Sequence, residues 1–204
     1  RAMRDAVRAY AASLRKGSIG VFYYTGHAVQ YRDTNYLLPT KAELRTTADL
    51  LDETFTLSYL MESIAEIPLQ LNVVVLDACR DWPAASRLSA TLGLGLARVP
   101  APANSVVVFS TSPGTRALDG LGRNSPFTNR FLSHVVEPGI TIEEMLKRII
   151  RGVLEDTTKL RAPQRPWYDS SFGGKFCFNG CDDPAVATEL AQIRAAQEQI
   201  RQER

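Results

Sequence analysis

Apolar residues along the chain follow two alternating patterns, one typical of amphipathic helices and the other of buried strands. Four segments place apolar side chains three and four residues apart, which predicts helices over residues 1–16, 57–67, 127–136 and 142–154. Three short apolar runs rich in β-branched residues predict strands over residues 19–24, 72–76 and 105–109. Helices that alternate with strands buried on both faces predict an α/β fold, in which a mostly parallel sheet flanked by helices forms a three-layer sandwich.

Weaker patterns complete this outline. Residues 35–38 and 176–178 predict short strands, the second at an edge of the sheet. Thr141 is followed three residues later by Glu144, which predicts a capping box at the start of the last helix. Residues 81–104 are rich in Pro, Ala, Gly and Ser without a sustained period, and this composition predicts a loop.

Length and composition indicate one globular domain with an extension. The chain has 204 residues, of which 45% are apolar and 23% charged, enough to build one hydrophobic core. We place the domain at residues 1–180 and a helical linker or tail at 181–204, where a coiled-coil contact is the less favoured alternative. Because residue 1 is an arginine inside a predicted helix, we expect an N-terminal strand region of the domain to be missing.

Charge and cysteine content narrow the partners. The net charge is only +2 and the charges are scattered, so no nucleic-acid surface is predicted, and no apolar run approaches the roughly 20 residues that cross a membrane. The expected partner is a peptide or protein substrate of a monomer or weak dimer. Three cysteines and two histidines are too few for a disulfide framework or a zinc site, which favours a reducing, cytoplasmic compartment. We interpret Cys177 and Cys181 as packing residues or a thiol pair.

Two residues with the chemistry of a cysteine peptidase follow predicted strands. His27 comes after the strand over 19–24, and Cys79 comes after the strand over 72–76. The carboxyl ends of neighbouring parallel strands meet, so we expect the imidazole to lie beside the thiol, where it can take the proton and generate the thiolate. A histidine or a cysteine taken alone more often has a structural role. The presence of both residues, together with the sequences around them, favours a catalytic role.

The flanking residues resemble a known family. Residues 22–27, Phe-Tyr-Tyr-Thr-Gly-His, resemble the segment that carries the catalytic histidine of caspases and metacaspases. Residues 75–80, Val-Leu-Asp-Ala-Cys-Arg, resemble the strand of the nucleophile, with the Asp of metacaspases in place of the Gln of caspases. Three further segments are similar to parts of bacterial caspase-like proteins: 35–39, 110–114 and 122–128. The chain resembles the bacterial metacaspase or orthocaspase type of caspase-like cysteine peptidase.

This resemblance implies a caspase–hemoglobinase fold and roles for individual residues. His27 would be the general base and Cys79 the nucleophile, and the N–H groups of Ala28 and Cys79 would bind the oxyanion. Thr25 and Asp77 would line the pocket for the residue before the scissile bond. Because a carboxylate in such a pocket attracts a cationic side chain, we predict cleavage after Arg or Lys. The alternative for Asp77 is a buried carboxylate that caps a loop.

Other expectations concern the surroundings of the site. Ser110 and Thr111 are candidates to line the substrate cleft, although a role as ordinary turn residues is slightly favoured. Arg87 and Arg98 lie in the loop after the nucleophile and are candidate self-cleavage points. No cofactor and no metal site are expected, and activation by calcium is left open because metacaspases often show it.

Two other functions compete with an active peptidase. Ala28 stands where the family usually has glycine, and Ala disfavours a positive φ by about 1 kcal/mol or more. A site that needs a positive φ there would be inactive, and the chain would then be a caspase-fold pseudoprotease that serves as a protein interaction module. The third candidate, a ligand-binding doubly wound domain, would need a Gly-rich phosphate loop directly after a strand, which residues 93–95 do not provide.

Overall fold

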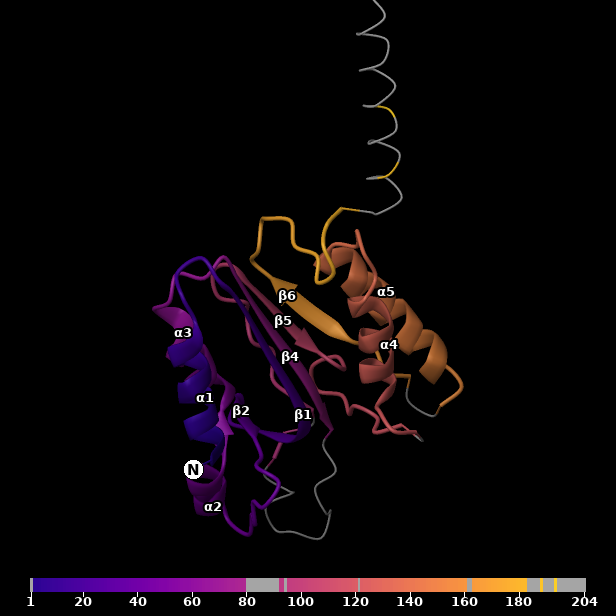
Figure 1. Ribbon diagram of the computed structural model, residues 1–204. Helices are drawn as coiled ribbons and strands as arrows, with labels where there is room; N and C mark the ends of the chain where they lie inside the picture. Colours follow the sequence, from indigo (N-terminus) through magenta and orange to yellow (C-terminus); the bar gives the residue numbers. More distant parts are fainter. Residues whose placement is uncertain are drawn as a thin grey trace, which may run out of the picture.

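A mixed six-stranded sheet between two layers of helices forms the protein (Figure 1). This computed structural model describes residues 2–79, 92–93, 95–120, 122–160 and 163–182, with Thr188 and Ile193, and only the backbone of Cys79. The strands are β1 (Ile19–Tyr31), β2 (Thr34–Leu37), β3 (Phe55–Thr56), β4 (Leu71–Cys79), β5 (Ser105–Phe109) and β6 (Trp167–Ser170). Their order across the sheet is β3-β2-β1-β4-β5-β6. The predicted α/β three-layer architecture is confirmed.

Only the centre of the sheet is parallel. β4 pairs in parallel with β1 on one side and with β5 on the other, whereas β2, β3 and β6 pair antiparallel to their neighbours. β1 turns into β2 at Arg32 and Asp33, both with positive φ, as in the two-residue turns that join hairpin strands. The prediction of a strand over 176–178 is wrong, because the edge strand on that side is β6, which was not predicted.

Helices cover both faces of the sheet (Figure 1). α1 (Ala2–Ser13), α2 (Thr47–Glu53) and α3 (Leu57–Ala65) lie on one side, and α4 (Pro126–Val135) and α5 (Ile142–Thr157) on the other. The four predicted helices are confirmed within a few residues at each end, and α2 was not predicted. None of the helices in the described ranges is both long and apolar enough to cross a membrane.

Three hydrophobic clusters hold these layers together: one on each face of the central strands, and a third in which Leu50 of α2 packs with Val29 and Tyr36 of the β1–β2 hairpin. Side chains at alternate positions of β4 and β5 point to opposite faces, so Leu76 packs toward α1 and α3, whereas Val75 packs toward α4 and α5. β5 is buried throughout, as predicted. The prediction of burial on both faces is wrong for β1, where Val21 is 42% and Tyr23 36% exposed.

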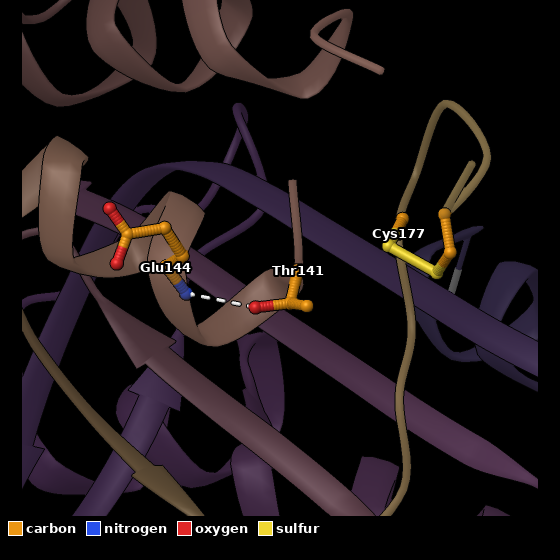
Figure 2. Close-up of a disulfide and its surroundings, with 4 residues drawn as sticks. Thr141, Glu144 and Cys177 are labelled. Atoms are coloured by element: carbon orange, nitrogen blue, oxygen red, sulfur yellow. Dashed lines mark hydrogen bonds between the residues drawn. A yellow bond between two sulfur atoms is a disulfide. The ribbon is translucent and has the colours of Figure 1, made fainter. Parts of the chain in front are cut away.

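The connection between α4 and α5 is tied to the segment after β6. Cys177 and Cys181 form a disulfide, whereas the sequence led us to interpret them as packing residues or a thiol pair. Close to the disulfide, the Thr141 hydroxyl accepts a hydrogen bond from the Glu144 amide and caps α5 (Figure 2). The second half of the predicted capping box is absent in this described helix, since the Glu144 carboxylate accepts instead from Arg148.

Candidate active site

His27 and Cys79 lie directly opposite each other in the parallel pair of β1 and β4. Cys79 is the last residue of β4, and the position of its side chain lies outside the described part of the structure. The prediction that His27 follows the end of its strand is wrong, because β1 continues through Tyr31 to pair with β2. His27 nevertheless lies where the parallel pairing ends, and its side chain is exposed to solvent.

A pocket of about 490 Å³ opens beside His27. Its walls come from β1, from β4 and from the segment that leads into α4: Tyr23, Thr25, Gly26, His27, Asp77, Asp119, Gly120, Gly122, Arg123, Asn124, Ser125 and Thr128. Thr25 and Asp77 are register partners, two residues before the His27–Cys79 pair on each strand. The structure therefore brings Thr25, His27 and Asp77 to one pocket.

Asp77 is buried, with 2% of its surface exposed, and is bound through one carboxylate oxygen. Its Oδ2 accepts hydrogen bonds from the Ser125 hydroxyl and from the Thr128 hydroxyl, the latter at 2.6 Å. Ser125 is also the N-cap of α4 and accepts from the Thr128 amide at 2.9 Å. Residues 122–128 contribute to the family resemblance, but their contact with Asp77 was not predicted. A Ser-Pro pair before a helical pattern signals the cap, but not its partner 48 residues away.

The hydroxyl groups of two adjacent tyrosines are also tied to the site. Tyr23 is hydrogen-bonded to Thr128 at 2.7 Å on the pocket side of β1. Tyr24, on the opposite face, donates to the carbonyl of His27 at 2.5 Å, and its oxygen accepts from the Leu38 amide at 3.2 Å. Burial raises the pKa of both tyrosines to about 12, so both hydroxyls keep their proton at neutral pH. The sequence analysis assigned neither residue a role.

The backbone at Ala28 bears on the oxyanion site. Among the described residues, positive φ outside glycine occurs only at Arg32, Asp33 and Asn104, so Ala28 does not have the positive φ that an alanine disfavours. The Leu38 amide donates to the His27 carbonyl at 3.0 Å, which makes these two a hydrogen-bonded pair of the antiparallel ladder. The next pair is then non-hydrogen-bonded, and the N–H of Ala28 points away from β2 toward the side of β1 where β4 lies.

Ser110 and Thr111 lie elsewhere. They line a small hollow with Ala28, Leu76 and Ala78, on the face of the sheet covered by α1 and α3. Ser110 is buried, and its carbonyl accepts from the Gln164 amide at 2.6 Å. The structure does not bring these two residues to the pocket of Asp77.

The loop after Cys79 is described only in its second part. Arg87 lies outside the described residues, and Arg98 lies over the ring of Trp167, 4.9 Å from its centre, with Asp169 4.0 Å away. Within the described ranges, no group of three His, Cys, Asp or Glu side chains is arranged to hold a metal ion.

Comparisons with known proteins bear on the family and the fold. The sequence matches the caspase-domain family over residues 1–177. The fold is similar to caspase-1 from Spodoptera frugiperda, with a TM-score of 0.55 and 15% identity over 87% of this chain and 70% of that one. It is also similar to a protein from Geobacter sulfurreducens, with a TM-score of 0.59 and 16% identity over 90% of this chain and 79% of that one. No curated protein matches the sequence significantly.

Proposed function

Because the chain belongs to the caspase-domain family, whose members are cysteine peptidases, we propose that it is an endopeptidase that uses His27 and Cys79 as its catalytic dyad. The single observation that carries this proposal is the register of the two central strands. This register puts the two residues opposite each other where the parallel pairing of β1 and β4 ends, beside the pocket. The Asp two residues before Cys79 favours the metacaspase type within the family.

The proposed reaction has two steps. His27 takes the proton of the Cys79 thiol, and the thiolate attacks the scissile carbonyl to form a tetrahedral oxyanion. In this proposal the N–H groups of Ala28 and Cys79 stabilise the oxyanion. His27 then gives the proton to the leaving amine. In the second step, water hydrolyses the thioester and frees the thiol.

The pocket supports a preference for Arg or Lys at the position before the scissile bond. Asp77 is a buried acid on its wall, and Thr25 lies opposite it. A carboxylate away from bulk water binds a guanidinium or ammonium group and repels an acidic side chain. Asp119 adds a second acid to the lining, whereas Arg123 opposes it. We therefore propose cleavage after basic residues and not after Asp.

Hydrolysis of fluorogenic peptides tests the proposal. Peptides that end in Arg, Lys or Asp before the fluorophore are given to the wild-type protein and to Cys79→Ala, with and without calcium. We expect turnover after Arg and Lys only, and we expect its loss in Cys79→Ala. Self-cleavage after Arg87 or Arg98 is followed on the same samples by mass spectrometry. An absence of turnover in every condition would refute the enzyme and leave the caspase-fold interaction module as the function.

A further inference from the structure

The two carboxylate oxygens of Asp77 have different surroundings. Oδ2 accepts from Ser125 and Thr128, whereas Oδ1 is buried and has no hydrogen-bond partner within the described part of the chain. An unpaired buried acceptor costs free energy, and a ligand in the pocket that donates a hydrogen bond to it would remove this cost. Oδ1 is the oxygen of this carboxylate that remains for a ligand.

The directions of the hydrogen bonds around Oδ2 follow from what each group can do. A carboxylate only accepts, so the Ser125 and Thr128 hydroxyls both donate to it. With its proton used in this way, Thr128 Oγ1 must accept from Tyr23, whose hydroxyl lies at 2.7 Å. The Ser125 oxygen accepts from the Thr128 amide in turn. The hydroxyl protons of Ser125 and Thr128 therefore point at Asp77, and the hydroxyl proton of Tyr23 points at Thr128.

The network holds Asp77 without cancelling its charge. Its donors are neutral hydroxyls, and none of the ion pairs formed among the described residues involves Asp77. Ser125 is the N-cap of α4, and Phe127 anchors this helix in the core with no exposed surface. The positive end of a helix dipole also favours a carboxylate at this point. The negative charge is thus fixed in place by a rigid element and left whole for a cation.

We infer that Ser125 and Thr128 are positioning residues for substrate specificity. They fix Asp77 through Oδ2 so that Oδ1 can pair with the guanidinium or ammonium group of the residue before the scissile bond. This inference rests on the proposed function and deepens it. The competing explanation is that the same contacts only cap α4, in which case their loss changes the stability of the protein but not its choice between cationic and neutral side chains.

Thr128→Val tests the inference, because it removes the hydroxyl and keeps the shape and the amide that bonds Ser125. The readout is the ratio of kcat/KM for a peptide with Arg to that for the same peptide with citrulline, its neutral isostere. We expect Thr128→Val to lower this ratio by about tenfold, and Thr128→Ser, which retains the hydroxyl, to preserve it. Ser133→Ala on the exposed side of α4 removes a hydroxyl that donates to the Asn129 carbonyl and, among the described residues, has no contact with Asp77, so it serves as the matched control.

The outcomes separate this inference from the proposed function. If Thr128→Val leaves the ratio of kcat/KM for the Arg peptide to that for the citrulline peptide unchanged, the inference is overturned, and the proposed peptidase function is unaffected. If the wild-type protein cleaves no peptide, the proposed function fails, and binding of benzamidinium, a planar cation, is measured by calorimetry instead. Binding that is about tenfold weaker in Thr128→Val supports the positioning role, and equal binding in both proteins overturns it.

Discussion

At the scale of single residues, the backbone beside His27 depends on Gly26. Its φ is +153°, a value that side chains other than glycine rarely adopt, and a Cβ at this position would lie 2.9 Å from the Tyr24 hydroxyl. That hydroxyl is the group that bonds the His27 carbonyl. Gly26 therefore allows the Tyr24 ring to pack against the part of β1 that carries His27.

We expect Gly26→Ala to lower the free energy of unfolding by about 1–3 kcal/mol, because it adds backbone strain and displaces the Tyr24 ring. The kcat/KM should fall as well, since the His27 backbone loses its anchor. Urea unfolding and peptide hydrolysis measure the two effects. Gly173→Ala is the control, because a Cβ there meets no atom within 4 Å. A Gly26→Ala protein as stable as the wild type would contradict this account.

At the scale of elements, one ion pair joins α4 to α5. The Arg130 guanidinium donates two hydrogen bonds to the Asp156 carboxylate, at 2.7 and 2.6 Å. Gly152, in the interior of α5, leaves room for this side chain, because a Cβ there would lie 2.7 Å from Arg130 Nε. These hydrogen bonds from Arg130 lower the pKa of Asp156 below its usual value.

The lowered pKa gives a pH-dependent prediction. A carboxyl whose pKa is lower in the folded state stabilises the protein above its unfolded pKa of about 3.9, and this contribution is lost as the pH falls through the folded value. Both side chains are partly exposed, so we expect Asp156→Asn to cost only about 0.5–1 kcal/mol at pH 7. The difference should shrink below about pH 4. Urea titrations at several pH values measure it, with the exposed Asp5→Asn as a control, and a difference that persists at low pH would contradict it.

At the scale of the whole molecule, α4 connects two distant structural features. Its first turn bonds Asp77 near the carboxyl end of β4, and beyond its other end the Val136 carbonyl accepts from Asn179, inside the loop that the Cys177–Cys181 disulfide closes. A helix of 10 residues is about 15 Å long, so the disulfide is remote from the pocket beside His27.

We expect the double variant Cys177→Ala/Cys181→Ala to lose stability but not activity. Opening so short a loop lowers the free energy of unfolding by about 2 kcal/mol or less. The kcat/KM for an Arg peptide should stay within about twofold of the wild type, because α4 keeps its own contacts with the core. Thermal unfolding measures the loss of stability and peptide kinetics measure the activity, and the wild-type protein with its disulfide reduced is a second comparison. A large loss of activity in a folded variant would show that the disulfide acts on the site.

The sequence alone determined the local elements and the identity of the chemical groups. Apolar periodicity located the central strands and four helices, because period and burial are properties of neighbouring residues. The flanking sequences of His27 and Cys79 pointed to the family, and the resemblance to that family suggested Asp77 as a pocket residue. Each of these inferences uses residues close together in the chain.

Only the tertiary structure decided the antiparallel strands, the disulfide, and the partners of Asp77. β6 is short and half-buried, so its pattern is weak, and it is a strand because β5 offers it an edge. The Ser125 and Thr128 hydroxyls reach Asp77 because α4 packs its first turn against β4. These hydroxyls lie 48 and 51 positions from Asp77 in the sequence. Such long-range contacts depend on how the layers pack, which no local pattern of apolar and polar residues encodes.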